Sequence, residues 1–386
     1  MPVKQLSPAP PTDHAIETLV AVCAQAVGHP ALYTRLREAV SRVQRWDWLA
    51  ERAEAHGLTP LVYTHLQAAD VALPLSVQDE LRGYYLQHAH ASRVRTTVLT
   101  DILTAFQARA IEVLLLKGAA LAYLVYPQPA LRPMRDIDLL VPAETALRAQ
   151  AVLQELGFTA AATSLPVDHH HLPACERVVD GQLVSVEVHS ALDPGYLTGA
   201  PSTHADLAPA AHPFTLDGRP AATLSREDML GHIYRHTFLI HWRYEWPRLV
   251  GVADLVSLVE AWGNQLDWDR LRSRYPAAYR SLPVLNQFTP WSDKTRQRLG
   301  IVSPPGQDDI GEALIHWPLS PVGAHEGLTA PHVVWARLFP PPLWLRLTHG
   351  YGPSRLDLWR ARLAHLRWLG SRAMRRSRTR WEARRK

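Results

Sequence analysis

The spacing of apolar residues predicts amphipathic helices in the first part of the chain. Apolar side chains recur every three or four positions, at Leu36, Val40, Val43, Trp46 and Leu49. This spacing places them on one face of a helix. The pair His56-Gly57, followed by Pro60, is typical of a helix end and the start of the next helix. We therefore expect a helical region over residues 15–110, preceded by a Pro-rich, disordered N-terminus, residues 1–14.

The pattern then shortens to a two-residue alternation. The apolar run 111–116 predicts a buried strand, and residues 136–141 and 177–189 alternate apolar with polar side chains. Asp180-Gly181 is a strong signal for a two-residue turn, so residues 177–189 are predicted to form a hairpin. A helix is expected over residues 144–156, between the second strand and the hairpin.

Helical periodicity returns after this segment. We expect an α+β fold in which a small mixed β-sheet, with helices on one face, occupies residues 111–225 and is flanked by N- and C-terminal helical regions. The C-terminal helical region is expected over residues 226–370, with a long Pro- and Gly-rich connection at about 303–342. Near its end, a helical stripe of large apolar residues predicts core packing; its members are Trp359, Leu363, Leu366 and Leu369.

Composition is that of a folded cytoplasmic protein. The chain has 386 residues, of which 47% are hydrophobic. Its two cysteines, Cys23 and Cys175, lie far apart, which fits a reducing compartment better than a disulfide scaffold. The N-terminus lacks the apolar core of a signal peptide, and the chain has no apolar run long enough for a transmembrane helix. We expect a cytoplasmic location and no membrane partner.

The net charge of +5 is concentrated at the C-terminus. Residues 372–386 contain eight Lys and Arg residues against Glu382 alone, a net charge of +7 that leaves the rest of the chain near −2. The basic tail, residues 371–386, is interpreted in two ways. It contacts RNA, DNA or another anionic surface, or it is a solvated helix end.

The most informative chemistry is the pair Asp136 and Asp138. In a strand both side chains point to the same face, opposite to Ile137 and Leu139. Two neighbouring carboxylates repel each other, and a divalent cation between them removes the repulsion. Carboxylate oxygens are the ligands that Mg²⁺ prefers, and Mg²⁺ usually binds together with substrate phosphates. The pair therefore predicts a magnesium site, with two ions expected.

Upstream of the pair, a strand leads through Lys117, Gly118 and Ala119 into a helix. A glycine turn at a helix N-terminus presents backbone N–H groups that bind anions. Lys117 adds a positive charge suited to phosphate. The alternative is that Lys117 is a solvated strand end.

Three segments together resemble a known family. They are Lys117–Leu121, Leu131–Met134 and Asp136–Val141. They resemble the uncharacterised nucleotidyltransferase family of the DNA polymerase β-like nucleotidyltransferase superfamily, over about residues 45–370. The resemblance implies a third carboxylate on a later strand, which Glu187 supplies, followed by His189.

The resemblance also implies roles for individual residues. Asp136, Asp138 and Glu187 would be the catalytic and metal-binding carboxylates. The expected nucleotide-binding residues are Lys117, Gly118, Ala119, Arg132, Arg135 and His189. The chain departs from many relatives at Lys117-Gly118, where they have Gly-Gly or Gly-Ser. Arg135 is bulkier than the small residue common at its position, and either contacts phosphate or pairs with a carboxylate.

Several histidines lie outside this motif. The run 169–171 is expected in a loop near the site and not as a zinc site, because adjacent residues do not converge easily on one ion. His232, His236 and Asp254 either line the substrate cleft or are buried for structural reasons.

The sequence thus favours a metal-dependent nucleotidyltransferase that uses Mg²⁺ and an NTP to modify an unknown hydroxyl-bearing acceptor. Two alternatives stay open. One is a toxin-like enzyme that acts on tRNA, which the basic tail would contact. The other is a non-catalytic nucleotide- or RNA-binding protein that kept the fold.

Overall fold

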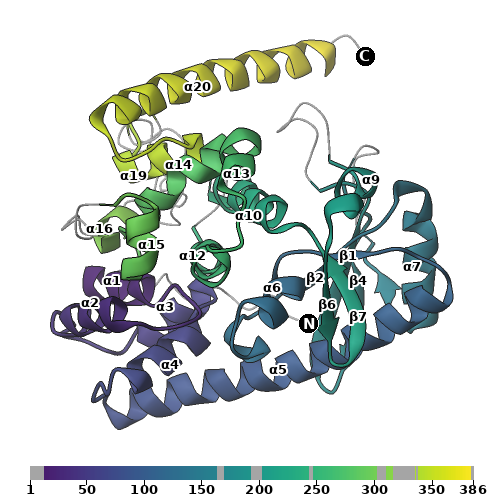
Figure 1. Ribbon diagram of the computed structural model, residues 1–386, viewed down its shortest axis with the longest axis horizontal. Helices are drawn as coiled ribbons and strands as arrows, with labels where there is room; N and C mark the ends of the chain where they lie inside the picture. The colour runs from purple at the N-terminus through teal and green to yellow at the C-terminus, as the bar shows by residue number, and fades with distance from the viewer. Residues whose placement is uncertain are drawn as a thin grey trace.

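The computed structural model describes residues 13–162, 169–192, 202–242, 247–301, 310–315, 335 and 338–383. Figure 1 shows a β-sheet on one side of the molecule and helices from both ends of the chain on the other. The long helix α5, Leu75–Ala108, runs beneath both parts and connects them.

The first helices follow the predicted pattern. They are α1 (His14–Val22), α2 (Pro30–Val40), α3 (Leu49–His56) and α4 (Thr59–Ala68). Gly57 ends α3 in the left-handed conformation with φ of 69°, and Pro60 lies in the first turn of α4. Asp13 begins α1 by accepting a hydrogen bond from the backbone N–H of Ala15, so the first helix starts one residue before the predicted boundary.

Seven strands form one mixed sheet. They are β1 (Leu114–Leu115), β2 (Asp136–Leu140), β3 (Thr159–Ala160), β4 (Cys175–Val179), β5 (Gln182–His189), β6 (His212–Leu216) and β7 (Arg219–Thr223). The strand order is β3-β4-β5-β2-β1-β7-β6. β2 pairs in parallel with β5 and β1 with β7, and the other neighbours are antiparallel. The predicted α+β class with a small mixed sheet is confirmed.

The β4–β5 hairpin forms where Asp180-Gly181 predicted it. Asp180 and Gly181 have φ values of 47° and 74°, as a type I′ turn requires. Along β5 the valines at 184, 186 and 188 are buried, which leaves Glu187 on the opposite face of the strand. The parallel pairing of β2 with β5 then sets Asp138 directly beside Glu187.

The β6–β7 hairpin was not predicted. Its turn, Asp217-Gly218, has φ values of 47° and 77° and repeats the signal seen at Asp180-Gly181. Pro213 and Pro220 lie inside its strands, and proline argues against a strand interior. Pro213 is tolerated because β6 is the edge of the sheet, and Pro220 because β7 pairs with β1 only at Thr223. β7 extends the sheet by pairing with β1.

Short helices link the strands and cover the sheet. α6 (Gly118–Leu124) follows β1, α7 (Ala146–Glu155) follows β2, and α9 (His204–Leu207) precedes β6. Both α5 and α7 pack against β5, and α6 packs against β2. β1 is shorter than the predicted run 111–116, although Leu116 still donates its N–H to the carbonyl of Asp138.

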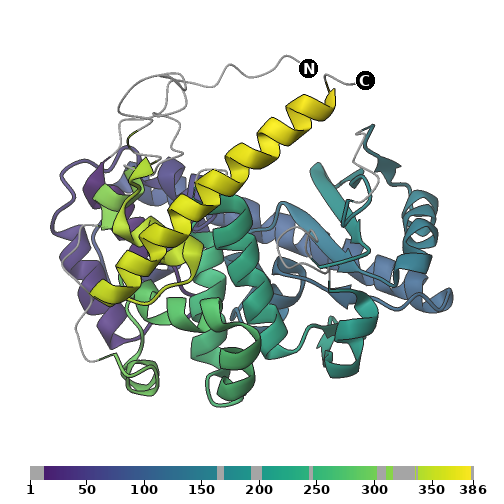
Figure 2. The same ribbon diagram turned by 90° about the horizontal axis from the view of Figure 1, so that it is seen from above.

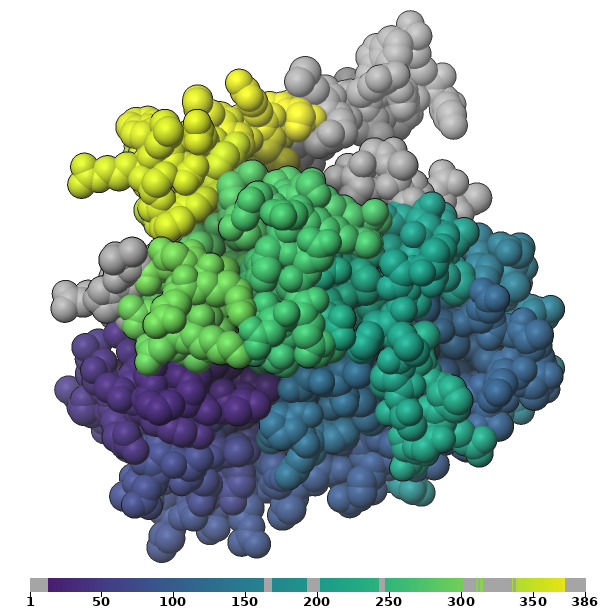
Figure 3. All heavy atoms as spheres, viewed as in Figure 1, coloured from purple at the N-terminus to yellow at the C-terminus, as the bar shows by residue number. Residues whose placement is uncertain are grey.

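The helices after residue 226 form the predicted C-terminal helical region. They are α10 (Arg226–Tyr234), a π-helical segment (Arg235–His241), α12 (Val250–Trp262), α13 (Trp268–Arg274), α14 (Pro276–Leu285), α15 (Asp293–Arg298), α16 (Ile310–Ile315), α19 (Pro342–His349) and α20 (Arg355–Ala383). Figure 3 shows this region directly against the N-terminal helices. Gln25, just after α1, donates to the hydroxyl of Thr289 at 2.8 Å, and α1 packs against α16.

Helix α20 extends away from the body of the molecule (Figure 2). Its apolar stripe was predicted to be core, and this prediction is wrong, because Trp359 is 64% exposed and Leu363 55% exposed. The opposite face packs instead, with Ala361 and His365 buried. The backbone of residues 371–383 continues the helix, and the side chains from residue 372 onward lie outside the described part of the chain.

Two further expectations concern cysteines and membranes. Cys23 and Cys175 are both free and buried. Among the described helices, none combines the length and the apolar character needed to cross a bilayer. Residues 1–12 and most of the connection at 303–342 lie outside the described residues.

Candidate active site

Two carboxylates and one imidazole converge where the middle of β2 lies beside the carboxyl end of β5. One ligand atom each from Asp138, Glu187 and His189 lies within 4.8 Å of the others. The Nε2 atom of His189 is 2.9 Å from Oδ1 of Asp138 and 3.5 Å from Oε2 of Glu187. The strand register explains this convergence, because β2 and β5 are parallel neighbours and His189 follows Glu187 by two residues on the same face.

Asp136 lies next to this group, and its electrostatic situation is the reverse of that of Asp138. Burial raises the pKa of Asp136, and the negative charge of Asp138 raises it further. Burial also acts to raise the pKa of Asp138, but the Lys117 ammonium and His189 outweigh it and hold that pKa well below its ordinary value. Among the described residues, Asp136 is not part of the group of donors within 4.8 Å.

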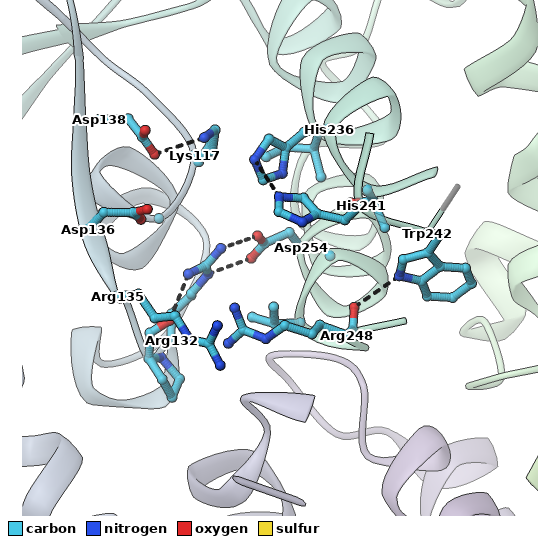
Figure 4. Close-up of a pocket in the computed structure, with 16 residues that line it drawn as sticks. Lys117, Arg132, Arg135, Asp136, Asp138, His236, His241, Trp242, Arg248 and Asp254 are labelled. Atoms are coloured by element: carbon cyan, nitrogen blue, oxygen red, sulfur yellow. Dashed lines mark hydrogen bonds and ion pairs between the residues drawn. The ribbon is translucent and has the colours of Figure 1, made fainter. Parts of the chain in front are cut away.

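Lys117 contacts a carboxylate in this structure. Its Nζ atom is 3.1 Å from Oδ2 of Asp138, and only 12% of its side chain is exposed (Figure 4). Its backbone has φ of 47° and ψ of −126°, a region that normally requires glycine and costs about 1–3 kcal/mol for other residues. Here the strain accompanies a buried cation that neutralises Asp138.

Gly118 and Ala119 begin α6 beside the cavity. A Cβ atom on Gly118 would lie 2.7 Å from Nη1 of Arg132 and 2.8 Å from Cγ of Met134. Glycine is therefore required by the close approach of Arg132, whether or not the turn also binds phosphate. Ala119 is buried.

Arg132 forms a buried ion pair across the two halves of the molecule. Its Nε and Nη2 atoms donate to the two carboxylate oxygens of Asp254 on α12, at 3.0 and 2.6 Å. Its Nη1 donates to the carbonyl of Pro133, and the hydroxyl of Tyr126 also donates to Asp254. Arg132, which was predicted to bind nucleotide, lines the cavity, and its side-chain nitrogens all have protein acceptors.

Arg135 and Arg248 lie at the same end of the cavity as Arg132, and Figure 4 shows them close together. No salt bridge joins either of them to an acidic residue in the described part of the chain. Burial lowers the pKa of Arg248 to about 10, and the neighbouring charges of Arg135 and Arg132 act in the same direction. Gly57 lies behind Arg248, because a Cβ atom there would be 3.1 Å from its Nη2. The N-terminal helices thus pack behind Arg248, although none of their residues lines the cavity.

The cavity between the two ends has a volume of about 190 Å³. Asp136, Asp138 and Lys117 line it from the sheet side, and His236, His241 and Asp254 line it from the C-terminal helices. His236 and His241 are five residues apart, and the π-helical segment brings their Nε2 atoms to 3.1 Å. Burial and the charge of Lys117 hold the pKa of His236 well below its ordinary value.

A sequence profile of the uncharacterised nucleotidyltransferase family matches residues 42–285, more than half of the chain. The chain belongs to this family. The match ends well before residue 370, so the last helices lie beyond the shared part. No curated protein is detectably similar in sequence to the chain.

Solved structures similar to this family member include two of an antibiotic-resistance factor. The solution structure of ANT(2'')-Ia is 19% identical over 50% of this chain and 96% of its own, with a TM-score of 0.34. The crystal structure of ANT(2")-Ia in complex with adenylyl-2"-tobramycin is 18% identical over 48% and 98%, with a TM-score of 0.34. An antigenic nucleotidyltransferase-like protein from Paracoccidioides brasiliensis is 16% identical over 53% and 98%, with a TM-score of 0.33. At this level of similarity the overlap says nothing about substrate.

The remaining predicted site residues of this family member are on α10, the π-helical segment and α12, and in the loop at 169–171. His236 and Asp254 line the cavity, as one of the two interpretations expected, whereas His232 is buried in α10 and does not line it. The 169–171 run lies in a loop beside the site. Nε2 of His171 is 3.8 Å from Oε2 of Glu187, and the His171 and His189 rings are 5.1 Å apart.

Sequence reasoning missed Arg248, His241 and Arg95. Arg95 lies on α5, where burial lowers its pKa and the charge of Asp136 partly offsets that effect. No local pattern marks Arg248 or Arg95, because they come near the site only through the packing of helices onto the sheet. His241 had one usable signal, its position five residues after His236 in a histidine-rich helix.

Proposed function

We propose that the protein is a metal-dependent nucleotidyltransferase that moves a nucleoside monophosphate from an NTP to a hydroxyl group of an acceptor still to be identified. One observation carries the proposal. One cavity presents the carboxylates of Asp136 and Asp138 at one end. At the other end it presents the guanidinium groups of Arg135 and Arg248, which have no acidic partner in the described part of the chain. Glu187 and His189 lie beside Asp138, outside the lining of this cavity. Such a cavity suits a ligand that carries both a divalent cation and several phosphates.

The donor set fits a divalent metal. Asp138 and Glu187 offer oxygen ligands within 4.8 Å of each other, and Asp136 lies two residues before Asp138 on the same strand face. We propose that these three carboxylates hold Mg²⁺, with two ions in the complete site. When bound, the metal would neutralise phosphate charge and orient the attacking and leaving oxygens.

The chain's own residues supply binding and orientation. Arg135 and Arg248 would hold the phosphates that leave as pyrophosphate, while Arg132 keeps the basic end in place through Asp254. Glu187, with 24% of its side chain exposed, is open enough to meet the acceptor. It would accept the proton of the acceptor hydroxyl as that oxygen bonds to the α-phosphorus and the bond to pyrophosphate breaks.

The decisive experiment uses NTPs labelled at the α-phosphate. The full chain is incubated with each of the four nucleotides, Mg²⁺ and either cell extract or defined hydroxyl acceptors. Transfer of label with release of pyrophosphate is expected for at least one nucleotide. An NTP with Mg²⁺ should also raise the melting temperature, because a ligand of the native state stabilises it.

A non-catalytic nucleotide binder is the second candidate, and Lys117 is the observation that favours it. Its ammonium already neutralises Asp138 without a metal. Nucleotide binding that does not depend on Mg²⁺, together with no transfer to any acceptor, would decide for this candidate.

A further inference from the structure

We infer that Asp138, Glu187 and His189 form a metal site in which the imidazole of His189 is a direct ligand, so that this position prefers Mn²⁺ over Mg²⁺. The inference deepens the proposed function by naming an imidazole among the ligands and the ion they select. Its test does not depend on nucleotidyl transfer.

The spacing of the donors supports coordination. Adjacent ligands of an octahedral ion with bonds of about 2.1 Å lie about 3 Å apart. Nε2 of His189 is 2.9 Å from Oδ1 of Asp138 and 3.5 Å from Oε2 of Glu187. These donors already stand close to the spacing of neighbouring octahedral positions, and small side-chain movements would complete it.

Asp138 is arranged so that one oxygen is available to an ion. Its Oδ2 is held by Lys117 at 3.1 Å, while its Oδ1 faces His189. The lysine therefore leaves Oδ1 as the ligand. Coordination would replace the hydrogen bond between Nε2 and Oδ1, and the imidazole proton would leave to solvent.

His189 is fixed in this orientation by its surroundings. Only 2% of the residue is exposed, and its strand position is set by pairing with Leu140. The rings of His170 and His171 pack against it, with centroids 5.5 and 5.1 Å away. A buried imidazole pointed between two carboxylates is preorganised to bind an ion without a large loss of side-chain entropy.

The ligand types favour a transition metal. Mg²⁺ takes oxygen ligands and dehydrates reluctantly. Imidazole suits first-row transition metals and carboxylates suit Mn²⁺, so Mn²⁺ accepts all three side chains more readily than Mg²⁺ does and represents the first-row ions in the test. The structure also provides a matched comparison, because Nε2 of His171 is 3.8 Å from the same oxygen of Glu187 and 17% of its side chain is exposed.

The test uses Mn²⁺ as the probe with the full chain and no nucleotide. Electron paramagnetic resonance gives the affinity, and electron spin-echo modulation detects a nitrogen ligand. The wild type should show imidazole nitrogen coupling and bind Mn²⁺ at least about tenfold more tightly than Mg²⁺. His189→Gln should lose the coupling and most of this preference, whereas His171→Gln should keep both.

Three results would overturn the inference. They are tight Mn²⁺ binding by the wild type with no nitrogen coupling, coupling that disappears in His171→Gln only, and no Mn²⁺ binding at millimolar concentration. The wild-type spectrum decides even if His189→Gln fails to fold. A parallel transfer assay with Mg²⁺ separates the two ideas. Transfer without nitrogen coupling leaves the proposed function standing, and coupling without transfer leaves only the metal site.

Discussion

The acidic and basic ends of the cavity are built in different ways. At the acidic end, Asp138 has contacts to Lys117 and to His189, and neighbouring strands of one sheet set the geometry. At the basic end, Arg248 comes from the segment before α12 and Arg135 from the segment before β2. Among the residues that the structure describes, only Arg132 of these three has an acidic partner. The charge of Asp138 is thus balanced within the protein, whereas Asp136 is repelled by its carboxylate neighbours. The basic end carries excess positive charge that a polyanionic ligand would neutralise.

This difference predicts which residues contribute to stability and which contribute to ligand binding. A residue that completes a balanced group should contribute to the free energy of unfolding, and removing it leaves a buried charge without a partner. A residue in the unbalanced group should contribute to ligand affinity, and removing it relieves repulsion between like charges. Each of the following changes tests one side of this contrast.

The largest effect is expected from the two aspartates of β2. Asp136→Asn and Asp138→Asn should each lower transfer by at least about 10³-fold, because each removes a proposed metal ligand. Their effects on stability at pH 7 should be opposite. Asp138→Asn leaves the Lys117 ammonium buried without its partner and should cost about 3–5 kcal/mol, whereas Asp136→Asn removes a repelled carboxylate and should leave stability equal or higher. Urea unfolding of both variants measures this.

The contributions of Asp138 and Asp136 to the free energy of unfolding should also depend on pH in opposite directions. The folded pKa of Asp138 lies well below its ordinary value of 3.8, so its contribution to stability is present above that value and lost as the pH falls below it. The folded pKa of Asp136 is raised, so its contribution is present below 3.8 and lost as the pH rises through the folded pKa. Equal unfolding curves for the two Asn variants at all pH values would contradict the assignment.

The next effect concerns the ion pair that joins the sheet to α12. Arg132→Met leaves Asp254, which is 1% exposed, without its guanidinium and should lower the free energy of unfolding by about 3–5 kcal/mol. The double variant Arg132→Met with Asp254→Leu should recover much of that loss, because no buried charge remains. Thermal and urea unfolding provide the measurement. No recovery in the double variant would show that packing, and not charge, is what Arg132 contributes.

A smaller effect, on affinity alone, is expected at Arg248 and Arg135. Arg248→Gln and Arg135→Gln should each raise the KM for the NTP by roughly 10- to 100-fold, which corresponds to one or two charge-assisted hydrogen bonds. Their stability should be unchanged or slightly higher. Arg37→Gln on α2, an exposed arginine far from the cavity, is the matched control. Unchanged KM in both cavity variants would remove the phosphate-binding role.

The smallest effect is expected from the distant basic segment. Deleting residues 372–386 should leave transfer to a small acceptor within about twofold of the full chain, because the match to the family ends at residue 285. If the acceptor is tRNA, the deletion should instead weaken RNA binding and reduce its salt dependence. Affinity of both forms for RNA across a salt series distinguishes these cases. Equal and negligible RNA binding by both would eliminate the tRNA-directed alternative.

The acidic and basic ends of the cavity also differ in how much of their structure could be predicted from the sequence. Alternation along residues 136–141 and 177–189, with the Asp180-Gly181 turn, predicted the strands and the faces on which Asp138 and Glu187 lie, and the family resemblance supplied the expectation that the two carboxylates meet. This succeeded because strand periodicity is a local property. The β6–β7 hairpin, with the second Asp-Gly turn, was not predicted, because its strands contain prolines and proline argues against a strand.

The basic end could not be predicted in this way. Arg132 was expected to bind nucleotide, but Asp254, its acceptor, lies 122 positions later in the chain. Arg248 reaches the cavity only because α12 docks beside α10. The prediction that the apolar stripe on α20 is core was wrong for the same reason. Helical spacing identifies the residues that share a face, but not whether another element covers that face.

The packing of α1 on the far end of the chain has a consequence for synthesis on the ribosome. The hydroxyl of Thr18 accepts a hydrogen bond from the N–H of Gly311, 293 positions later in the chain. Gln25 donates a hydrogen bond to the hydroxyl of Thr289, 264 positions later. At about 5–20 residues per second, translation of that interval takes roughly 15–60 s. During this time the apolar residues Ile16, Leu19 and Val20 have emerged without their eventual C-terminal cover. The nascent chain therefore exposes the apolar face of its first helix until residues 289–311 have been synthesised, which makes α1 a segment for chaperones to shield.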